Sequence, residues 1–268
     1  MAVLLTAGPE TATSGYTLSI AEGAAQVAAA QKLRHDVFVN EFGARLCSPT
    51  PGLDIDDLDP YCDHLIVSED RSGAVVGTYR MLPPDRAAAA GRRYAEGEFD
   101  LSPLAPLRDD LVEIGRSCVA PEHRSGAVIN LMWAGIARYL HLRGLRWLGG
   151  CASVPLEDGG VMAAGVWAEV SRRHLSPPPL RLRPHRPWLA EPDAVAALAT
   201  SGEGGSGGVA IRGRAQMPPL LRGYLRLGAW VCGEPAYDPD FDVADLYVLL
   251  SFDRMPDRYR RHFLGPDR

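Results

Sequence analysis

The sequence contains very little lysine and carries no excess of positive charge. Lys32 is the only lysine among 268 residues, and the formal net charge at pH 7 is −5. Proteins that bind nucleic acid through its phosphate backbone carry a broad basic surface, which this balance does not supply. The charge therefore argues against a nucleic-acid partner.

Long apolar runs and paired cysteines are also missing. No stretch approaches the roughly 18 apolar residues that a membrane-spanning helix requires, and the opening MAVLLTAGPE lacks the basic region of a signal peptide. The cysteines are odd in number and do not show metal-ligand or CxxC spacing. We expect a cytoplasmic protein with free thiols and no metal site, in which these cysteines stay reduced: Cys47, Cys62, Cys118, Cys151 and Cys232.

The chain is rich in residues that can build a core, since 46% of them are hydrophobic. Alternation and helical spacing predict a mixed α/β fold, with one central sheet covered by helices. Expected strands are 16–20, 64–69, 74–82, 111–119, 147–154, 229–238 and 245–252. Expected helices are 21–42, 85–90, 128–142, 161–173 and 220–228. The two runs at 64–82 flank a glycine-containing turn, which is typical of a β-hairpin.

A compositional break occurs late in the chain. Residues 176–188 carry many prolines, and residues 201–208 read SGEGGSGG, which is typical of a linker. Strand-like sequence resumes afterwards, so we interpret residues of about 176–216 as a mobile insertion. The prediction is one domain spanning 1–268 with this insertion.

Charged residues occur at four places in the sequence that are candidates for a functional site. Arg34 lies on the first predicted helix, and an acidic loop, DIDDLDPYCDH, holds Asp54, Asp56, Asp57, Asp59 and Asp63. Arg80 ends a strand, and EIGRSCV carries Glu113 and Arg116. Taken singly, each has an ordinary alternative, such as a surface charge or a helix cap. Glu113 and Arg116 are three apart, so they face opposite sides of a strand unless a bulge intervenes.

A glycine-containing loop leads into the long apolar helix after Glu113. PEHRSGA places His123, Arg124, Gly126 and Ala127 where backbone N–H groups and the helix dipole favour an anion. A phosphate or pyrophosphate is the expected ligand, although such a loop alone is a weak signal. Arg124 and Gly126 are only two residues apart, which makes this a short anion-binding loop.

Six strings occur together in the order of a known family. They are LRHDVFVNEFGA, DDLDPYCDHLIV, VVGTYRML, EFDLSPL, EIGRSCVAPEHRSGAVINLMWAGIARYL and LRGYLRLGAWVCGEPAYDPDFDVADLYVLL. The chain resembles the hemolysin-like L-ornithine Nα-acyltransferases of the GNAT superfamily, over about residues 30–263. Its first half is also similar to the acyl-homoserine-lactone synthases, which share the arginines, the paired aspartates and the ExxR element. The resemblance implies a GNAT-type central sheet.

The resemblance also implies roles for the charged residues. Catalytic residues would be Glu113, Arg116, Asp59 and Arg80, with Glu113 as general base. The acceptor amino acid would be bound by Arg34, Asp56, Asp57 and Phe38. The donor would lie along residues 111–119, in a gap beside residues 147–154, against Cys118, Val119, His123, Arg124, Gly126 and Ala127. A covalent acyl-Cys118 intermediate is the less favoured alternative.

The implied donor is an acyl-phosphopantetheine thioester on acyl carrier protein, with acyl-CoA as the alternative, and no cofactor is expected. Acyl carrier proteins are acidic, so basic residues at 138–146 or 172–186 could dock one. The amphipathic product makes peripheral membrane contact plausible. Three alternatives stay open: another amine acceptor, acyl-homoserine-lactone synthesis, and a non-catalytic module that binds acyl carrier or lipid.

Overall fold

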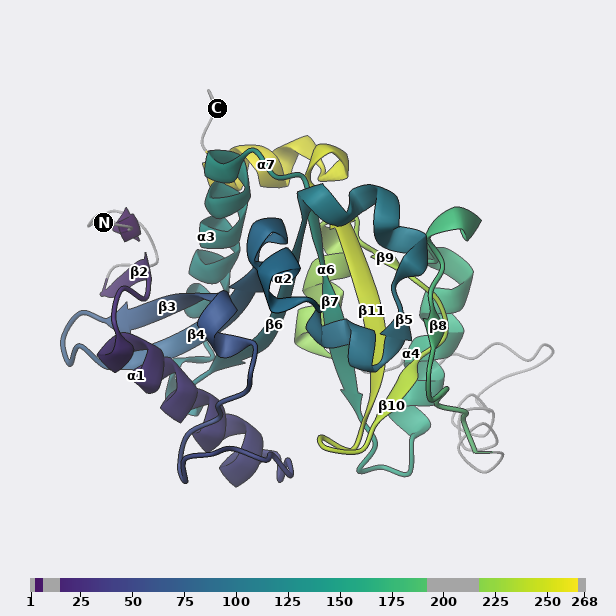
Figure 1. The fold of residues 1–268 in the computed structure, drawn as a ribbon, viewed down its shortest axis with the longest axis horizontal. Helices are drawn as coiled ribbons and strands as arrows, with labels where there is room; N and C mark the ends of the chain where they lie inside the picture. Colours follow the sequence, from purple (N-terminus) through teal and green to yellow (C-terminus); the bar gives the residue numbers. More distant parts are fainter. Residues whose placement is uncertain (1–2, 7–14, 192–216, 265–268) are drawn as a thin grey trace, which may run out of the picture. The chain divides into compact units, whose positions relative to one another are not determined.

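The β-hairpin expected at 64–82 is present and organises the first part of the chain. The computed structural model describes residues 3–6, 15–191 and 217–264 (Figure 1). Strand β3 (Asp63–Glu69) pairs antiparallel with β4 (Val75–Leu82), placing His64 opposite Arg80. β2 (Tyr16–Ile20) adds to β3, and β1 (Val3–Thr6) adds to β2. β6 (Leu111–Val119) pairs with the other edge of β4.

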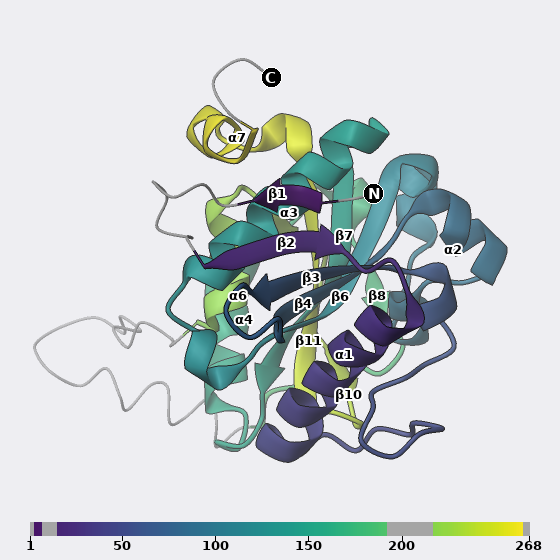
Figure 2. The ribbon, with the colours of Figure 1, turned by 90° about the vertical axis from the view of Figure 1, so that its left-hand side faces the viewer.

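Two helices cover opposite faces of this sheet (Figure 2). α1 (Ala24–His35) packs on β4 and β6, and α3 (Ala127–Arg143) packs on β2, β3 and β4. Since strand side chains alternate faces, Leu65 lies against α3, whereas its neighbour His64 faces α1 with Arg80. The α1 face therefore receives His64 and Arg80, whereas the α3 face is mostly apolar, with Asp63 accepting a hydrogen bond from the Tyr139 hydroxyl over 2.7 Å.

The chain divides into two compact units, each described separately here. The first holds the described residues within 1–93, 107–148 and 252–268, and the second those within 94–106 and 149–251. The first unit also contains α2 (Pro84–Ala90), α7 (Asp257–Leu264), η1 (Asp36–Glu41), η2 (Asp59–Tyr61), η5 (Pro121–His123) and η7 (Phe252–Arg254).

The second unit is built around β11 (Val243–Ser251), whose side chains are all buried. β10 (Ala236–Asp238) and β9 (Trp230–Val231) both pair antiparallel with β11, and β7 (Trp147–Pro155) is its neighbour on the other side. β5 (Phe99–Asp100) pairs with β8 (Arg183–Pro184). The unit also contains α4 (Val161–Arg173), α6 (Pro219–Arg226), η3 (Tyr94–Gly97), η4 (Ser102–Asp110, which ends in the first unit) and η6 (Pro178–Leu180).

Most predicted elements are confirmed, and the differences have local causes. The helix predicted to run to Phe42 is α-helical only to His35 and continues as a π-helix, η1. The sequence did not predict the four-residue β1, the 3₁₀ segment η4 or α7, which are short or strongly polar.

The predicted insertion is described only in part. Leu182 is buried and donates its N–H to the carbonyl of Cys232, and Trp188 donates its N–H to Pro235 over 2.9 Å. Residues up to 188 are thus held within the second unit by backbone hydrogen bonds. Residues 192–216 lie outside the described residues, so the single domain with a mobile insertion stays a prediction.

Candidate active site

Four segments of the first unit bring the predicted charged residues together on the α1 face of the sheet. α1 supplies Arg34, the loop before β3 supplies Asp54, Asp56 and Asp59, β4 supplies Arg80, and β6 supplies Arg116. We refer to these six side chains as the charged network. Three guanidinium groups face three carboxylates, so the formal charges balance within the network.

Arg34 is at the centre of the charged network, and its side chain is completely buried. Its Nη1 and Nη2 bind the two carboxylate oxygens of Asp59 at 3.1 and 2.6 Å. Its Nε lies 2.9 Å from Oδ2 of Asp54, and Nη2 also donates to the Asp54 carbonyl. Such a bidentate pair is among the stronger charged hydrogen bonds. Arg34 thereby fastens α1 to the acidic loop.

Arg80 and Arg116 complete the charged network. Nη1 of Arg80 lies 2.6 Å from Oδ1 of Asp56 and 2.9 Å from Oδ1 of Asp59. Nε of Arg116 is 3.3 Å from Oδ2 of Asp54, and its Nη2 is 3.6 Å from Oδ2 of Asp56. The side chains of Arg116 and Asp56 remain 11% and 21% exposed, whereas those of the other four members are at most 5% exposed.

A β-bulge in β6 explains how Arg116 reaches the charged network. Thr78 pairs with Cys118 and Arg80 with Gly115, so two steps along β4 match three along β6. Arg116 has φ 50°, a conformation uncommon for a residue with a side chain. Glu113 lies opposite Leu82, two residues from Arg80, and therefore on the same face. The bulge turns Arg116 to that face as well.

The buried members of the charged network keep their charges because each is paired with an opposite charge. Burial alone would raise the pKa of Asp59, but hydrogen bonds and charge from Arg34 and Arg80 hold that pKa far below its usual range. Burial likewise opposes the charge on Arg80, yet Asp56 and Asp59 keep its pKa above the ordinary value. Both groups stay charged at neutral pH. Removing one member would leave a buried charge without compensation.

Two buried side chains that the sequence analysis missed support Asp59. Gln31 donates from Nε2 to Oδ2 of Asp59 over 2.9 Å, and Nε2 of His64 lies 3.2 Å from the Asp59 carbonyl oxygen. Gln31 precedes Arg34 by three residues, a spacing that places both on one helix face and could have indicated the pair. Burial lowers the pKa of His64, so its ring is neutral at physiological pH.

Two of the predicted acceptor-binding residues lie outside the charged network. The Asp57 side chain is 72% exposed and pairs with Arg92. Phe38 is partly buried and packs with Leu33, Val37 and Cys118. The structure therefore joins Arg34 and Asp56 in the charged network but not Asp57 or Phe38.

The predicted donor residues lie where β6 leads into α3, but their side chains are engaged with protein groups. Arg124 binds Glu41 through Nη1 and Nη2, at 2.5 and 2.7 Å, and its Nε donates to the Val119 carbonyl over 3.0 Å. Nδ1 of His123 is 2.8 Å from the Tyr16 hydroxyl. Glu41, at the end of η1, is a partner that no sequence signal indicated.

The start of α3 and the thiol of Cys118 complete the donor region. Gly126 caps α3 with φ 95°, a conformation that glycine adopts without strain, and Ala127 is the first helical residue. Cys118 is buried, and burial raises the pKa of its thiol well above the usual value. The thiol stays protonated at neutral pH, which argues against an acyl-Cys118 intermediate.

A separate cluster of ligand-type side chains lies in the second unit. Glu98, Cys151 and Asp245 have their ligand atoms within 4.8 Å of one another, a group that could hold a metal ion. The Cys151 thiol donates to Oε2 of Glu98 over 3.6 Å. Burial, with the charges of Asp245 and Asp238, raises the pKa of Glu98 to about 10. Without an ion, Glu98 therefore holds a proton at neutral pH beside Asp245 and Cys151.

Comparisons with known proteins agree with this architecture. Residues 33–134, which include the charged network and the start of α3, match the family model of the acetyltransferase (GNAT) domain. The fold is also similar to that of the CoA-dependent acyl-homoserine lactone synthase BjaI with SAM and isopentyl-CoA. The TM-score is 0.51 at 16% identity, over 91% of this chain and 85% of that chain.

Curated relatives match nearly the whole chain. The L-ornithine N(alpha)-acyltransferase of Rhodobacter capsulatus is 34% identical over 92% of this chain and 94% of its own length. The proteins of the same name from Brucella abortus and Rhizobium meliloti are each 32% identical over 91% of this chain, and over 87% and 82% of their own lengths. At this identity and coverage, the chain belongs to the L-ornithine Nα-acyltransferase family of GNAT acyltransferases.

Proposed function

We propose that the protein transfers an acyl group, including 3-hydroxyacyl groups, from a phosphopantetheine thioester to the α-amine of L-ornithine. This reaction is the first step of ornithine lipid synthesis. The observation that carries the proposal is the match, at 31–34% identity over more than 90% of this chain, to four proteins named for this activity. The charged network and the bulge of β6 supply a physical basis for it.

Glu113 is the proposed general base. An α-amino group has a pKa of about 7.7–8.0, so only a modest base is needed to take its proton. The carboxylate is 5% exposed and lies on the charged-network face of β6. A carboxylate at this position can accept the proton directly or through a water molecule while the amine attacks the thioester carbonyl.

The bulge of β6 is the proposed source of transition-state stabilisation. A bulge takes backbone groups out of the regular ladder, here around Arg116 and between Gly115 and Cys118. An N–H from this stretch can donate to the oxygen of the thioester carbonyl as negative charge develops on it, as in an oxyanion hole. The gap expected between 111–119 and 147–154 for the pantetheine arm stays a prediction.

Members of the charged network differ in their proposed roles because their partners differ. Arg34 and Arg80 both bind Asp59, so these three residues act by holding α1, the acidic loop and β4 in place. Asp56 and Arg116 keep exposed atoms and are the members proposed to contact substrate. We therefore assign Arg34 a positioning role instead of the substrate contact expected from the sequence.

Acyl carrier protein is the proposed donor, with acyl-CoA as the alternative. For Arg124 to bind a donor phosphate, it must exchange its contacts with Glu41. The short loop before α3 suits the single phosphate of a carrier-bound pantetheine. No helix in the described part of the chain is long and apolar enough to cross a bilayer. A peripheral contact with the membrane remains part of the proposal because the product is amphipathic.

Product analysis tests the proposed reaction. Purified protein is mixed with a 3-hydroxyacyl carrier protein, acyl-CoA or acetyl-CoA and a panel of amino acids, and the products are identified by mass spectrometry. We expect an Nα-acyl adduct of ornithine alone. An adduct on another amine would keep the chemistry and replace the acceptor. No adduct with any donor would favour a non-catalytic module.

The Glu113→Gln variant tests the general base. Loss of proton transfer should lower kcat by about 10²–10⁴-fold while the melting temperature stays close to that of the wild type. Unchanged kcat in the folded variant would contradict this role. The pH profile of kcat/KM gives an independent measure. The wild-type profile should have an acidic limb, and this limb should be absent in Glu113→Gln because the base has been removed.

A further inference from the structure

The side chain of Arg124, in the loop that leads into α3, is held by a residue that is distant in sequence. Its Nη1 and Nη2 lie 2.5 and 2.7 Å from the two carboxylate oxygens of Glu41, at the end of η1. Its Nε donates to the Val119 carbonyl, and its guanidinium carbon lies 5.8 Å from the centre of the Phe42 ring. Each of the three guanidinium nitrogens thus already donates to a protein oxygen.

Glu41 gives Arg124 the same kind of contact that a donor phosphate would give. Carboxylates and phosphates both present pairs of oxygens that fit the planar fork of a guanidinium. The hydrogen bond from Arg124, together with its charge, holds the pKa of Glu41 below the usual value. Glu41 is therefore an anion at neutral pH, and it occupies the guanidinium that the proposed function assigns to the donor.

This pair is exposed enough to exchange partners. The side chains of Arg124 and Glu41 are 38% and 30% exposed, whereas those of Arg34 and Asp59 are at most 4% exposed. Exposed ion pairs contribute little to stability, so a stronger anion can displace Glu41 at a small cost. The start of α3 favours a phosphate further, since no side chain among the described residues caps its first turn, which follows Gly126.

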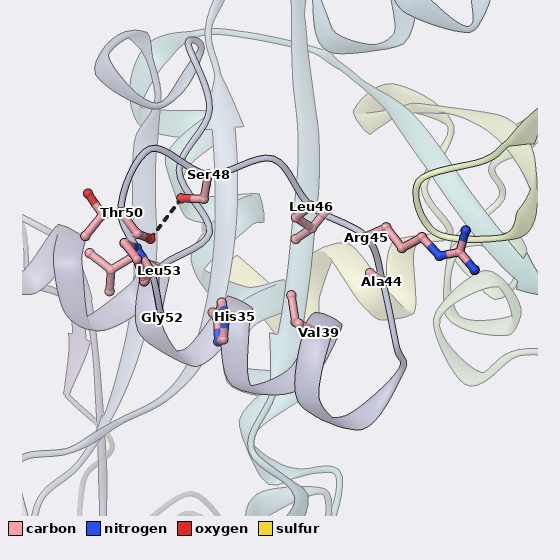
Figure 3. Close-up of a pocket in the computed structure, with 10 residues that line it drawn as sticks. His35, Val39, Ala44, Arg45, Leu46, Ser48, Thr50, Gly52 and Leu53 are labelled. Carbon is pink, nitrogen blue, oxygen red and sulfur yellow. Dashed lines mark hydrogen bonds between the residues drawn. The ribbon is translucent and has the colours of Figure 1, made fainter.

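The π-helix η1 has few other contacts that fix it. Val37 is its only buried residue, and it packs with Leu33 and Cys118. Val39, two residues later, instead borders a cavity of about 320 Å³ between η1 and the loop at 44–53 (Figure 3). A helix with few buried apolar contacts opens at a low free-energy cost. The pair between Glu41 and Arg124 is therefore a substantial part of what holds the end of η1.

We propose that Glu41 competes with the donor phosphate for Arg124, and that binding of the donor releases the end of η1. The inference rests on the proposed function and deepens it by naming a positioning residue that sets donor affinity through Arg124. When the phosphate binds Nη1 and Nη2, the Glu41 carboxylate turns to water. Arg34 still holds α1 through Asp54 and Asp59, so the release is limited to η1.

Two substitutions of glutamate by glutamine test the competition. Glu41→Gln removes the competing carboxylate, and we expect it to lower the KM for the acylated carrier protein about two- to fivefold, the range that an exposed ion pair allows, with kcat unchanged. Glu122→Gln is the matched control. Glu122, in η5, contributes its charge at Arg124, but the guanidinium donates to Glu41 and Val119. Its substitution should change the KM much less.

Two further measurements separate competition from a general effect on the fold. In the Arg124→Gln background, Glu41→Gln should no longer change the KM, because the competition requires both side chains. In calorimetric titrations of the full chain, Glu41→Gln should bind phosphopantetheine about two- to fivefold more tightly than the wild type does. Pantetheine, which has no phosphate, should show no such difference. Hydrogen exchange at residues 36–42 of the wild type should become faster when phosphopantetheine is added.

The outcomes separate this inference from the proposed function. If the wild type acylates ornithine and Glu41→Gln raises the donor KM, Glu41 orients Arg124 for the phosphate and the inference is wrong. An unchanged KM, or an equal change in Glu122→Gln, would also overturn it. If the wild type makes no product, the titrations decide: tighter binding of phosphopantetheine by Glu41→Gln supports the competition, and equal or absent binding rejects it. Hydrogen exchange that does not respond to phosphopantetheine would overturn the release of η1.

Discussion

Arg34 shows how strongly one residue can depend on its surroundings. Its guanidinium is completely buried and binds two carboxylates, while Lys32, two residues earlier on α1, makes an exposed pair with Asp36. Removing one partner of a buried ion pair costs far more than removing an exposed one, because the remaining charge has no water around it.

Arg34→Gln should therefore destabilise the protein by about 3–5 kcal/mol, and Lys32→Gln by less than about 1 kcal/mol. Urea unfolding followed by circular dichroism measures both. Equal, small losses would mean that the charged network contributes little to stability. Activity should fall in Arg34→Gln because α1 and the acidic loop are no longer held together.

Glu98 sets a pH dependence of the opposite sign to that of Asp59. The folded-state pKa of Glu98 is raised to about 10, above the ordinary 4.5, by burial and by Asp245 and Asp238. The folded state thus holds a proton that the unfolded chain releases, and stability falls as pH rises from about 4.5 toward 10. Asp59, whose folded pKa is depressed, instead contributes stability that is lost only in strong acid.

Glu98→Gln should remove this loss of stability at high pH. We expect the melting temperature of the variant, relative to wild type, to rise between pH 5 and pH 9 by an amount equivalent to at least about 1 kcal/mol, or roughly 2–4 °C. Glu96→Gln, two residues earlier, serves as the control. A melting-temperature difference that does not change with pH would show that Glu98 ionises normally.

At the scale of elements, the close approach of α3 to the sheet depends on glycine. A Cβ at Gly77 of β4 would come within 2.6 Å of Cγ1 of Val128 and 3.1 Å of the Met132 sulfur. Val128 is fully buried and β-branched, so it cannot rotate away easily. A Cβ at Gly115 of β6 would meet no atom within 4 Å.

Gly77→Ala should destabilise the protein by about 1–3 kcal/mol, as overpacking does in other cores. Gly115→Ala, also in a strand, should change the free energy of unfolding much less. Chemical unfolding of the two variants gives the comparison. A similar effect of both substitutions would indicate that strand propensity, and not the contact with α3, determines the result.

At the scale of the whole molecule, the proposed donor, acyl carrier protein, requires a docking surface. Arg143, at the end of α3, pairs with Asp85 at 3.1 Å, and the exposed Arg146 pairs with Asp110 at 2.6 Å. These carboxylates reduce the local positive charge, yet both arginines remain within reach of an acidic partner. The basic stretch at 172–186 is the other candidate for docking.

The double variant Arg143→Glu, Arg146→Glu should raise the KM for acyl carrier protein several-fold, because like charges then meet across the interface. The KM for acyl-CoA, which needs no protein docking, should stay the same. A melting curve checks the fold, since both ion pairs are lost. Unchanged KM for the carrier would remove this surface and leave the stretch at 172–186.

The sequence by itself determined much of this protein. Alternating and helical patterns located the hairpin β3–β4, β6, α3 and α4, because their periods follow from local geometry. The motifs carrying Arg34, Asp59, Arg80 and Glu113 were sufficient to identify the family to which the chain belongs. The secondary-structure patterns are local in the chain, and the family motifs occur along the chain in a fixed order.

Only the tertiary structure decided how those residues meet. The bulge at Arg116, the complete burial of Arg34 and the pairing of Arg124 with Glu41, 83 residues away, depend on strand register and packing between distant segments. The π-helix and the cavity beside it arise in the same way. Helical and strand periods specify which residues share a face, but the partner across the interface depends on how that face packs against the rest of the chain.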